Sequence, residues 1–138
     1  MNRIAAPTVT ELPSGIWHSV YRYSSSGRSG MFESEHFVRL QHQADHYELE
    51  SLPHTSKSLL RLELTLSGRI ATGTWRERTA PKGYYKGRLY EGAIQLVVDT
   101  DGRHMIGKWV GAGKDLTLNV GSWELTFVGE RLPGRDEH

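Results

Sequence analysis

Three observations in the sequence predict an all-β fold, an eight-stranded antiparallel up-and-down β-barrel. Apolar and polar residues alternate along most of the chain after Gly15; between Leu60 and Leu66, for example, every second residue is leucine. Such alternation is typical of a strand with one buried face and one face in solvent. The second observation is an unequal set of connections between the strands, and the third is a recurring Gly-x-Trp triplet.

The alternation divides the chain into eight expected strands. The second of them places Ser34 and His36 on the same face as Phe32 and Val38, because side chains two residues apart on a strand point to the same side. No window has the apolar spacing of a long helix, so we expect at most one short helix. The expected strands are residues 15–23, 32–41, 45–52, 59–66, 70–77, 88–98, 103–110 and 118–128.

The connections between these strands fall into two classes. The short ones lie around residues 42–45, 67–69 and 99–102. The long ones are residues 24–30, 53–58, 78–87 and 111–116. Consecutive connections of an up-and-down meander alternate between the two ends of the sheet, so every long connection is expected at one end. The sequence therefore predicts a barrel with one closed end and one open end.

All four tryptophans stand in a Gly-x-Trp triplet, at residues 15–17, 73–75, 107–109 and 121–123. Each triplet puts a glycine beside a tryptophan on the same face of a strand. The glycine either leaves room for the indole in a packed core or relieves strain where the sheet bends. Both interpretations allow some indoles to line a cavity, and the repeated pairs favour a closed barrel over an open sandwich.

The composition limits the function classes. The chain has 138 residues, a formal net charge of +1 and no cysteine. We expect one domain over residues 1–138, with a barrel core at about 15–128 and loose ends at 1–13 and 131–138. The near-zero charge does not favour double-stranded nucleic acid or an anionic membrane, and the lack of cysteine excludes disulfides and thiolate metal sites. No apolar stretch suits a signal peptide or a membrane span, so we expect a cytoplasmic protein.

An opening Gly-x-Trp on the first strand of an eight-strand meander resembles the lipocalin and avidin barrels, known together as calycins, over residues 15–128. The later triplets are more similar to avidin, but no biotin-binding residue set matches this chain. The stretches YRYSSSGR, SEHFVRL, ESLPHTSKS, ATGTWRERTAPKGYYKG and GKWVGAGKD resemble an uncharacterised actinobacterial module often found C-terminal to helix-turn-helix regulators. That second resemblance implies a sensing or interaction domain.

Motifs for catalysis or metal binding are weak in this chain. His42 and His46 flank a predicted turn and share no helical face, and the DTDG sequence at 99–102 lacks the later ligands of a calcium loop. The GAGKD sequence at 111–115 lacks the spacing of a phosphate-binding loop. We therefore expect no metal, no cofactor and no catalytic residue. His36 is either a hydrogen-bonded core residue or part of a ligand site.

The inward-facing residues predict a pocket for a small molecule. A lumen that mixes aromatic rings with hydroxyl groups suits a ligand with an apolar body and a few polar groups. Basic residues next to tyrosines in the long connections suit an anionic or aromatic ligand. The expected ligand-binding residues are Trp17, Tyr21, Tyr23, His36, Tyr47, Trp75, Tyr84, Tyr85, Trp109 and Trp123, and the expected rim residues are Arg28, Lys82, Lys86 and Lys114.

The sequence thus predicts a sensor-type barrel that binds a small molecule through the end with the long connections. Two alternatives stay open: a structural module that contacts a regulatory protein through its outer face, and a barrel-type cyclase or isomerase. An open cavity lined by Trp, Tyr and Ser favours ligand binding, and a filled lumen with an apolar outer patch favours the interaction module. A buried, unpaired carboxyl such as Glu77 or Glu91 favours the enzyme.

Overall fold

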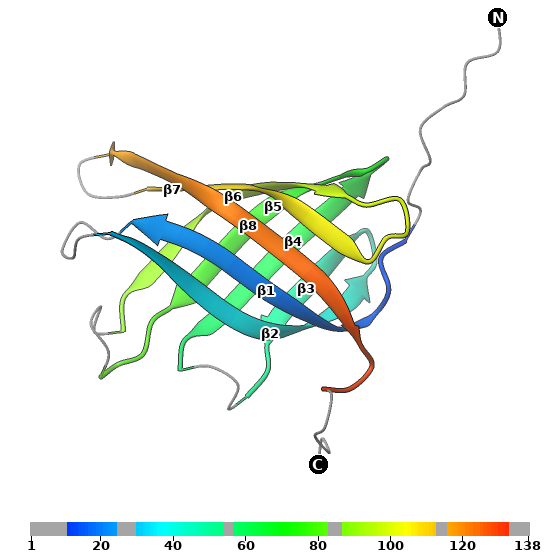
Figure 1. The fold of residues 1–138 in the computed structure, drawn as a ribbon, viewed down its shortest axis with the longest axis horizontal. Coiled ribbons are helices and arrows are strands. Elements are labelled where there is room, and N and C mark those ends of the chain that lie inside the picture. The colour runs from blue at the N-terminus through cyan, green and yellow to red at the C-terminus, as the bar shows by residue number, and fades with distance from the viewer. Residues whose placement is uncertain (1–10, 25–29, 54–56, 83–86, 113–115, 133–138) are drawn as a thin grey trace, which may run out of the picture.

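Eight antiparallel strands, each paired with the next, close into a barrel in the computed structural model (Figure 1). The structure describes residues 11–24, 30–53, 57–82, 87–112 and 116–132, which contain no helix long and apolar enough to cross a membrane. The strands are β1 Gly15–Ser24, β2 Met31–Gln43, β3 His46–Ser51, β4 Leu59–Ser67, β5 Ile70–Arg78, β6 Leu89–Val98, β7 His104–Ala112 and β8 Leu118–Gly129. The predicted fold class is confirmed, and each strand boundary lies within two residues of its predicted position.

The alternation in the sequence corresponds to an inner and an outer face of the barrel wall. In β4, Leu60, Leu62 and Leu64 are buried, whereas Arg61 and Glu63 between them are exposed. Inward-facing side chains from all eight strands form one hydrophobic core. Removal of this apolar surface from water stabilises the closed sheet.

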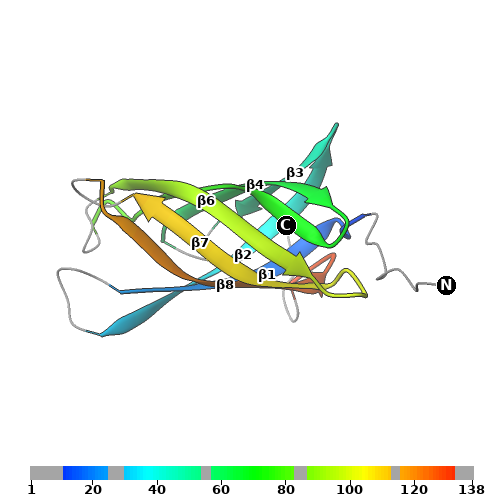
Figure 2. The same cartoon turned by 90° about the horizontal axis from the view of Figure 1, so that it is seen from above.

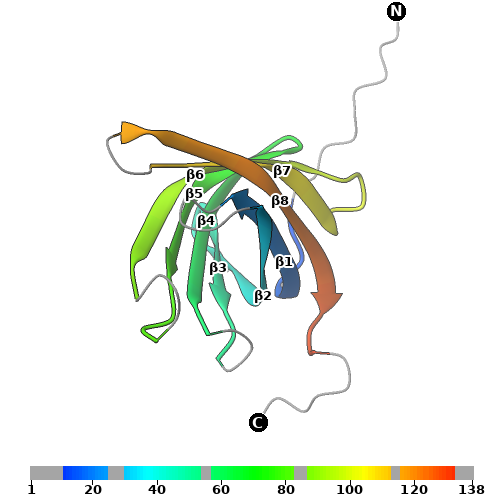
Figure 3. The same cartoon turned by 60° about the vertical axis from the view of Figure 1, so that its left-hand side comes forward.

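The short and long connections lie at opposite ends, as the meander requires. The β2–β3, β4–β5 and β6–β7 connections are short and lie together at what we call the closed end. At the other end, here called the open end, β1, β3, β5 and β7 finish and the next strands begin. Figure 3 brings this end forward and shows the strands arranged around a central axis.

Two leucines outside the strands pack against the barrel. Leu12, just before β1, is 1% exposed, and its N–H donates a hydrogen bond to the Tyr47 hydroxyl oxygen at 3.1 Å. Leu132, just after β8, is also buried. Both leucines fall in segments that we expected to be loose, and that expectation is wrong for them because packing removes their apolar side chains from water.

The glycines of the Gly-x-Trp triplets mark places where neighbouring strands approach closely. A Cβ atom at Gly73 would overlap the carbonyl oxygen of Glu63, and one at Gly107 would overlap that of Gln95. A Cβ at Gly121 would overlap the Arg22 carbonyl oxygen and the Trp109 indole. At these three positions a Cβ would therefore meet a neighbouring strand or another triplet's indole. The idea that each glycine makes room for its own tryptophan is wrong here, and the alternative of a tightly bent sheet accounts for them.

Candidate functional site

An aromatic cluster fills the middle of the barrel around Tyr21. The Tyr21 ring centroid lies 4.5 Å from that of Trp123, 6.2 Å from that of Trp109 and 6.4 Å from that of Trp75. All four side chains are buried. Rings at these separations attract one another beyond the simple burial of their area. The cluster forms an apolar part of the barrel interior, and the Trp75 and Trp109 indoles reach Val110 and Arg22 near the open end.

The N–H groups of all four indoles are used within the protein. Trp17 donates to the Pro13 carbonyl oxygen at 3.1 Å, Trp75 to that of Val110 at 3.2 Å, Trp109 to that of Arg22 at 3.0 Å, and Trp123 to Ser19 Oγ at 2.8 Å. Buried indole N–H groups need such partners, because an unpaired donor is costly. Because each indole N–H already donates to a protein acceptor, a ligand would contact the carbon atoms of these rings and not their N–H groups.

A polar cluster of three buried and two half-buried side chains lies near the open end and shares Tyr21 with the aromatic cluster. We call Tyr21, Ser34, His36, Ser58 and Glu77 the open-end polar cluster. The hydroxyl of Tyr21 donates to Glu77 Oε1, and the hydroxyl of Ser58 donates to Glu77 Oε2 at 2.7 Å. Ser34 Oγ reaches the same carboxylate oxygen at 3.5 Å. His36 Nε2 lies 2.7 Å from Ser58 Oγ and 3.3 Å from Glu77 Oε2.

The topology explains why these five residues meet. Tyr21 on β1 is paired in register with Ser34 on β2, and Glu77 is the penultimate residue of β5. Ser58 immediately precedes β4, whose second residue, Leu60, is paired with Glu77. All these strand segments are close to the open end, and their inward-facing positions converge there. The hydrogen bonds thus connect β1, β2, β5 and the segment before β4.

The charge state of Glu77 follows from its hydrogen bonds. Burial alone would raise the pKa of this carboxyl, but hydrogen bonds from His36, Tyr21 and Ser58 outweigh burial and hold the pKa below its ordinary value. For Tyr21, burial and then the nearby Glu77 charge raise the pKa well above its ordinary value. At neutral pH the cluster therefore contains a carboxylate that accepts hydrogen bonds and a neutral phenol that donates one.

His36 contributes a polar atom that the described residues leave without a partner. The side chain is fully buried, and its Nδ1 atom has no hydrogen-bond partner among the described residues. Buried polar atoms are usually paired with protein or water. The Nδ1 atom is thus a point at which a further polar group could bind within the barrel.

The residues that the sequence predicted for ligand binding lie in different parts of the barrel. Trp17 and Tyr47 lie toward the closed end, where Trp17 packs against Phe127 and Tyr47 bonds to Leu12. In the half toward the open end are Tyr21, Tyr23, His36, Trp75, Trp109 and Trp123. Lys82 is exposed after β5. The predicted residues outside the described part of the chain are Tyr84, Tyr85, Arg28, Lys86 and Lys114.

Sequence reasoning did not assign Ser34, Ser58 and Glu77 to the site. The alternation placed Ser34 on the inner face, and Glu77 stood out as a carboxyl that could be buried. Ser58 carried no such signal, because only the fold brings the segment before β4 against β2 and β5. Glu91, the other carboxyl considered, is exposed on β6 and pairs with Arg76 at 3.1 Å.

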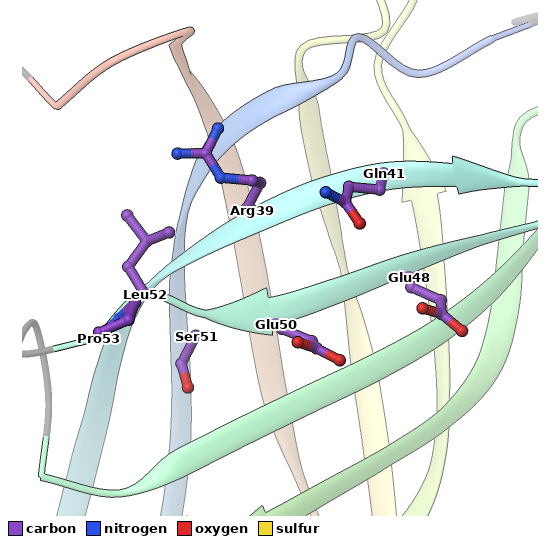
Figure 4. A pocket seen from close by; sticks show the side chains of 7 residues that line it. All are labelled: Arg39, Gln41, Glu48, Glu50, Ser51, Leu52 and Pro53. Carbon is purple, nitrogen blue, oxygen red and sulfur yellow. The ribbon is translucent and has the colours of Figure 1, made fainter. Parts of the chain in front are cut away.

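Two surface hollows lie outside the lumen. One is over β2 and β3, where Arg39, Gln41, Glu48 and Glu50 line it (Figure 4). Both glutamates of this hollow already pair with Arg61, at 2.8 and 3.2 Å. The other is at the closed end, beside Leu12 and Arg103. Neither includes a member of the open-end polar cluster.

Comparisons with known proteins do not assign the chain to a family. No protein-family model, no curated protein and no solved structure matches it. Within the described ranges, no group of three or more His, Asp or Glu side chains could hold a metal ion. The arrangement that remains for interpretation is the open-end polar cluster, which shares Tyr21 with the aromatic cluster.

Proposed function

We propose that the protein binds a small molecule through its open end, with the open-end polar cluster as the polar floor of the site. The observation that carries this proposal is the position of Glu77. An ionised carboxylate in a barrel interior is expensive, because burial removes its hydration. An apolar side chain would fill a purely structural barrel at lower cost, so a buried, hydrogen-bonded carboxylate near the open end supports a binding role.

The chemistry of the cluster indicates the kind of ligand. The Glu77 carboxylate and the His36 Nδ1 atom favour polar groups that hydrogen-bond to the floor, and the aromatic rings of Tyr21 and its neighbours favour a flat apolar body. At the rim, Lys57 and Lys82 are exposed. Exposed lysines favour an anionic group at the outer end of the ligand. An aromatic compound with a hydrogen-bonding inner end and an anionic outer end fits both features.

The proposal agrees with the two family resemblances seen in the sequence, to the lipocalin and avidin barrels and to the actinobacterial module. A lipocalin-like or avidin-like barrel that binds its ligand at one end is consistent with the observed topology and the position of the polar cluster. A sensing role in a cytoplasmic regulatory system, with a regulatory protein as partner, follows from the similarity to the actinobacterial module.

Two observations favour the interaction module as a second candidate, and the first is the aromatic cluster that fills the middle of the barrel. Second, Val97, Ile106, Leu118 and Val120 on the outer face of β6, β7 and β8 are between 43% and 68% exposed, and exposed apolar groups of this kind often mark contact surfaces. The enzyme alternative has less support. The carboxyl that would favour it, Glu77, already accepts hydrogen bonds from its neighbours.

The test is a thermal-shift screen of a metabolite and nucleotide library, since a compound that binds only the folded protein raises its melting temperature. For each hit, affinity is then measured by tryptophan fluorescence at a temperature where all variants are folded. We expect Glu77→Gln to weaken binding at least about tenfold. Glu91→Gln, the same change on the outer face, should leave the affinity unchanged. A library without hits, or a Glu77→Gln variant that binds as tightly as wild type, would contradict the proposal.

A further inference from the structure

The barrel wall is incomplete at the seam between β1 and β8. Their pairing runs from Ile16 opposite Gly129 to Tyr21 opposite Trp123 and stops there. In contrast, β1 stays paired with β2 as far as Ser24, and β7 stays paired with β8 as far as Leu118. The β1–β2 and β7–β8 hairpins therefore diverge toward the open end, and Figure 2 shows the ends of β1 and β8 apart on its left-hand side.

On the β1 side of this seam, one backbone carbonyl group finds its hydrogen-bond partner inside the barrel. In a continued register Arg22 would face Ser122, but the Arg22 carbonyl oxygen accepts its hydrogen bond from the Trp109 indole at 3.0 Å. The missing Cβ of Gly121 lets the indole and this carbonyl group approach. The indole thus takes the place of one bond of the missing strand pairing.

The β8 side has no comparable substitute among the described residues. Among the described residues, Leu118–Ser122 pair with β7 on one side and with no strand on the other, and the Arg22 carbonyl oxygen of β1 lies beside Gly121. Leu118 is 67% exposed and Val120 is 68% exposed. From residue 116 to 123 the sequence is LTLNVGSW, without charge or proline. Proteins usually protect an exposed strand edge with charges, proline or a bulge, and an unprotected apolar edge tends to pair with another strand.

We propose that this edge pairs with the same edge of a second copy of the chain, antiparallel and centred on Val120. A two-fold axis through this point places Val120 opposite the partner's Val120, and Leu118 opposite the partner's Ser122. The backbone N–H and C=O groups on the free side of this edge, those of every second residue, then bond to their counterparts in the other copy. The exposed valines come together on the outer face, and no like charges meet in the segment.

A second copy fits this edge for a further reason. A two-fold symmetric dimer uses the same surface on both copies. Two identical edges match in length, and this segment carries no charges that would repel each other. Val110 and Ala93 continue the apolar row from Val120 across β7 and β6. This row is available to pack against the partner beside the paired edges. The inference does not rest on the proposed ligand site, because none of its residues belongs to the open-end polar cluster.

The first test is a charge swap at position 120, read by sedimentation velocity over a range of protein concentrations. Wild type should dimerise. Val120→Lys and Val120→Glu should each weaken self-association at least about tenfold, because like charges meet at the axis. An equal mixture of the two variants should restore dimers. Val97→Lys, a matched change on the outer face of β6, should dimerise like wild type. A monomeric wild type, or a mixture that dimerises no better than either variant alone, would overturn the inference.

The second test uses the absence of cysteine from the chain. In antiparallel strands directly opposed Cα atoms are about 4.5–5.5 Å apart, which suits a disulfide. Under mild oxidation Val120→Cys should therefore form a covalent dimer, whereas Val97→Cys should not. Circular dichroism checks that both variants are folded. A folded Val120→Cys protein that stays monomeric on a non-reducing gel, or cross-linking to the same extent at both positions, would exclude this interface.

Discussion

The two ends of the barrel differ in the side chains that they bury. The closed end has short hairpins and is sealed by apolar packing, with Leu12 against Tyr47 and Trp17 against Phe127. The open end has the long connections and, directly inside them, a carboxylate with its hydrogen-bond donors. The closed end thus provides stability at low cost. The open end retains a buried charge, and that difference is the reason we propose it as the ligand-binding end.

The closed end also shows that an end of this barrel can be sealed without a buried charge. Leu12 and Trp17 are buried there beside Tyr47, whose hydroxyl accepts a hydrogen bond from the Leu12 N–H. Each polar group buried at the open end must recover the hydration it loses through hydrogen bonds within the protein. The comparison therefore makes separate predictions for the wall, for the closed end and for the open end.

The largest change in unfolding free energy is expected from a substitution in the barrel wall, between the two ends. Gly107→Val would place a branched side chain against the Gln95 carbonyl group on β6. Because the backbone of a paired strand cannot move aside, we expect a loss of about 3 kcal/mol or more in unfolding free energy. Urea denaturation followed by circular dichroism measures it. An unchanged midpoint would show that the two strands are not as close as the structure has them.

At the closed end, Leu12→Ala should cost about 2 kcal/mol or more, because it removes a fully buried leucine that covers the barrel. The matched control is Leu59→Ala on β4 near the open end. Leu59 is 64% exposed, so its loss should change the unfolding free energy by less than about 0.5 kcal/mol. Equal effects of the two changes would contradict the assignment of Leu12 as a seal.

At the open end, Tyr21→Phe removes the hydroxyl that donates to Glu77 and keeps the ring in its aromatic cluster. The carboxylate then lacks one donor, and we expect a loss of about 1–2 kcal/mol. Tyr47→Phe is the control at the closed end, since its hydroxyl accepts one bond from a backbone N–H. If both variants lose the same free energy, the charge of Glu77 does not distinguish the two ends.

The smallest effect concerns pH. The folded-state pKa of Glu77 lies below that of the unfolded chain, so its contribution to stability is complete above the unfolded pKa and is lost as pH falls through the folded pKa. Glu77→Gln cannot titrate. The unfolding free energy of wild type should therefore decrease more steeply on acidification than that of Glu77→Gln, as measured by urea denaturation at a series of pH values. Parallel pH profiles would mean that Glu77 is not held as a stabilised carboxylate.

The sequence was informative about the wall and less so about the site, for physical reasons. Alternation located the strands because burial of one face repeats every second residue, as between Leu60 and Leu66. The role of Gly107 could not be predicted correctly, because it depends on the distance to a neighbouring strand. Ser58 joins the cluster only through the closure of the barrel, and Leu12 gave no sign of its packing because it lies outside any periodic segment.

The central claim, that a ligand binds at the open end above the polar cluster, can be tested with the four indole N–H resonances of the ¹⁵N-labelled protein. Each tryptophan gives one signal, and Trp17 at the closed end is the internal control for Trp75, Trp109 and Trp123. On addition of a compound that raises the melting temperature, we expect the Trp109 and Trp123 signals to shift while the Trp17 signal stays in place. The shifts should disappear in Glu77→Gln at the same compound concentration. If the compound shifts Trp17 alone, or shifts all four signals equally in wild type and in Glu77→Gln, the open end is not the binding site.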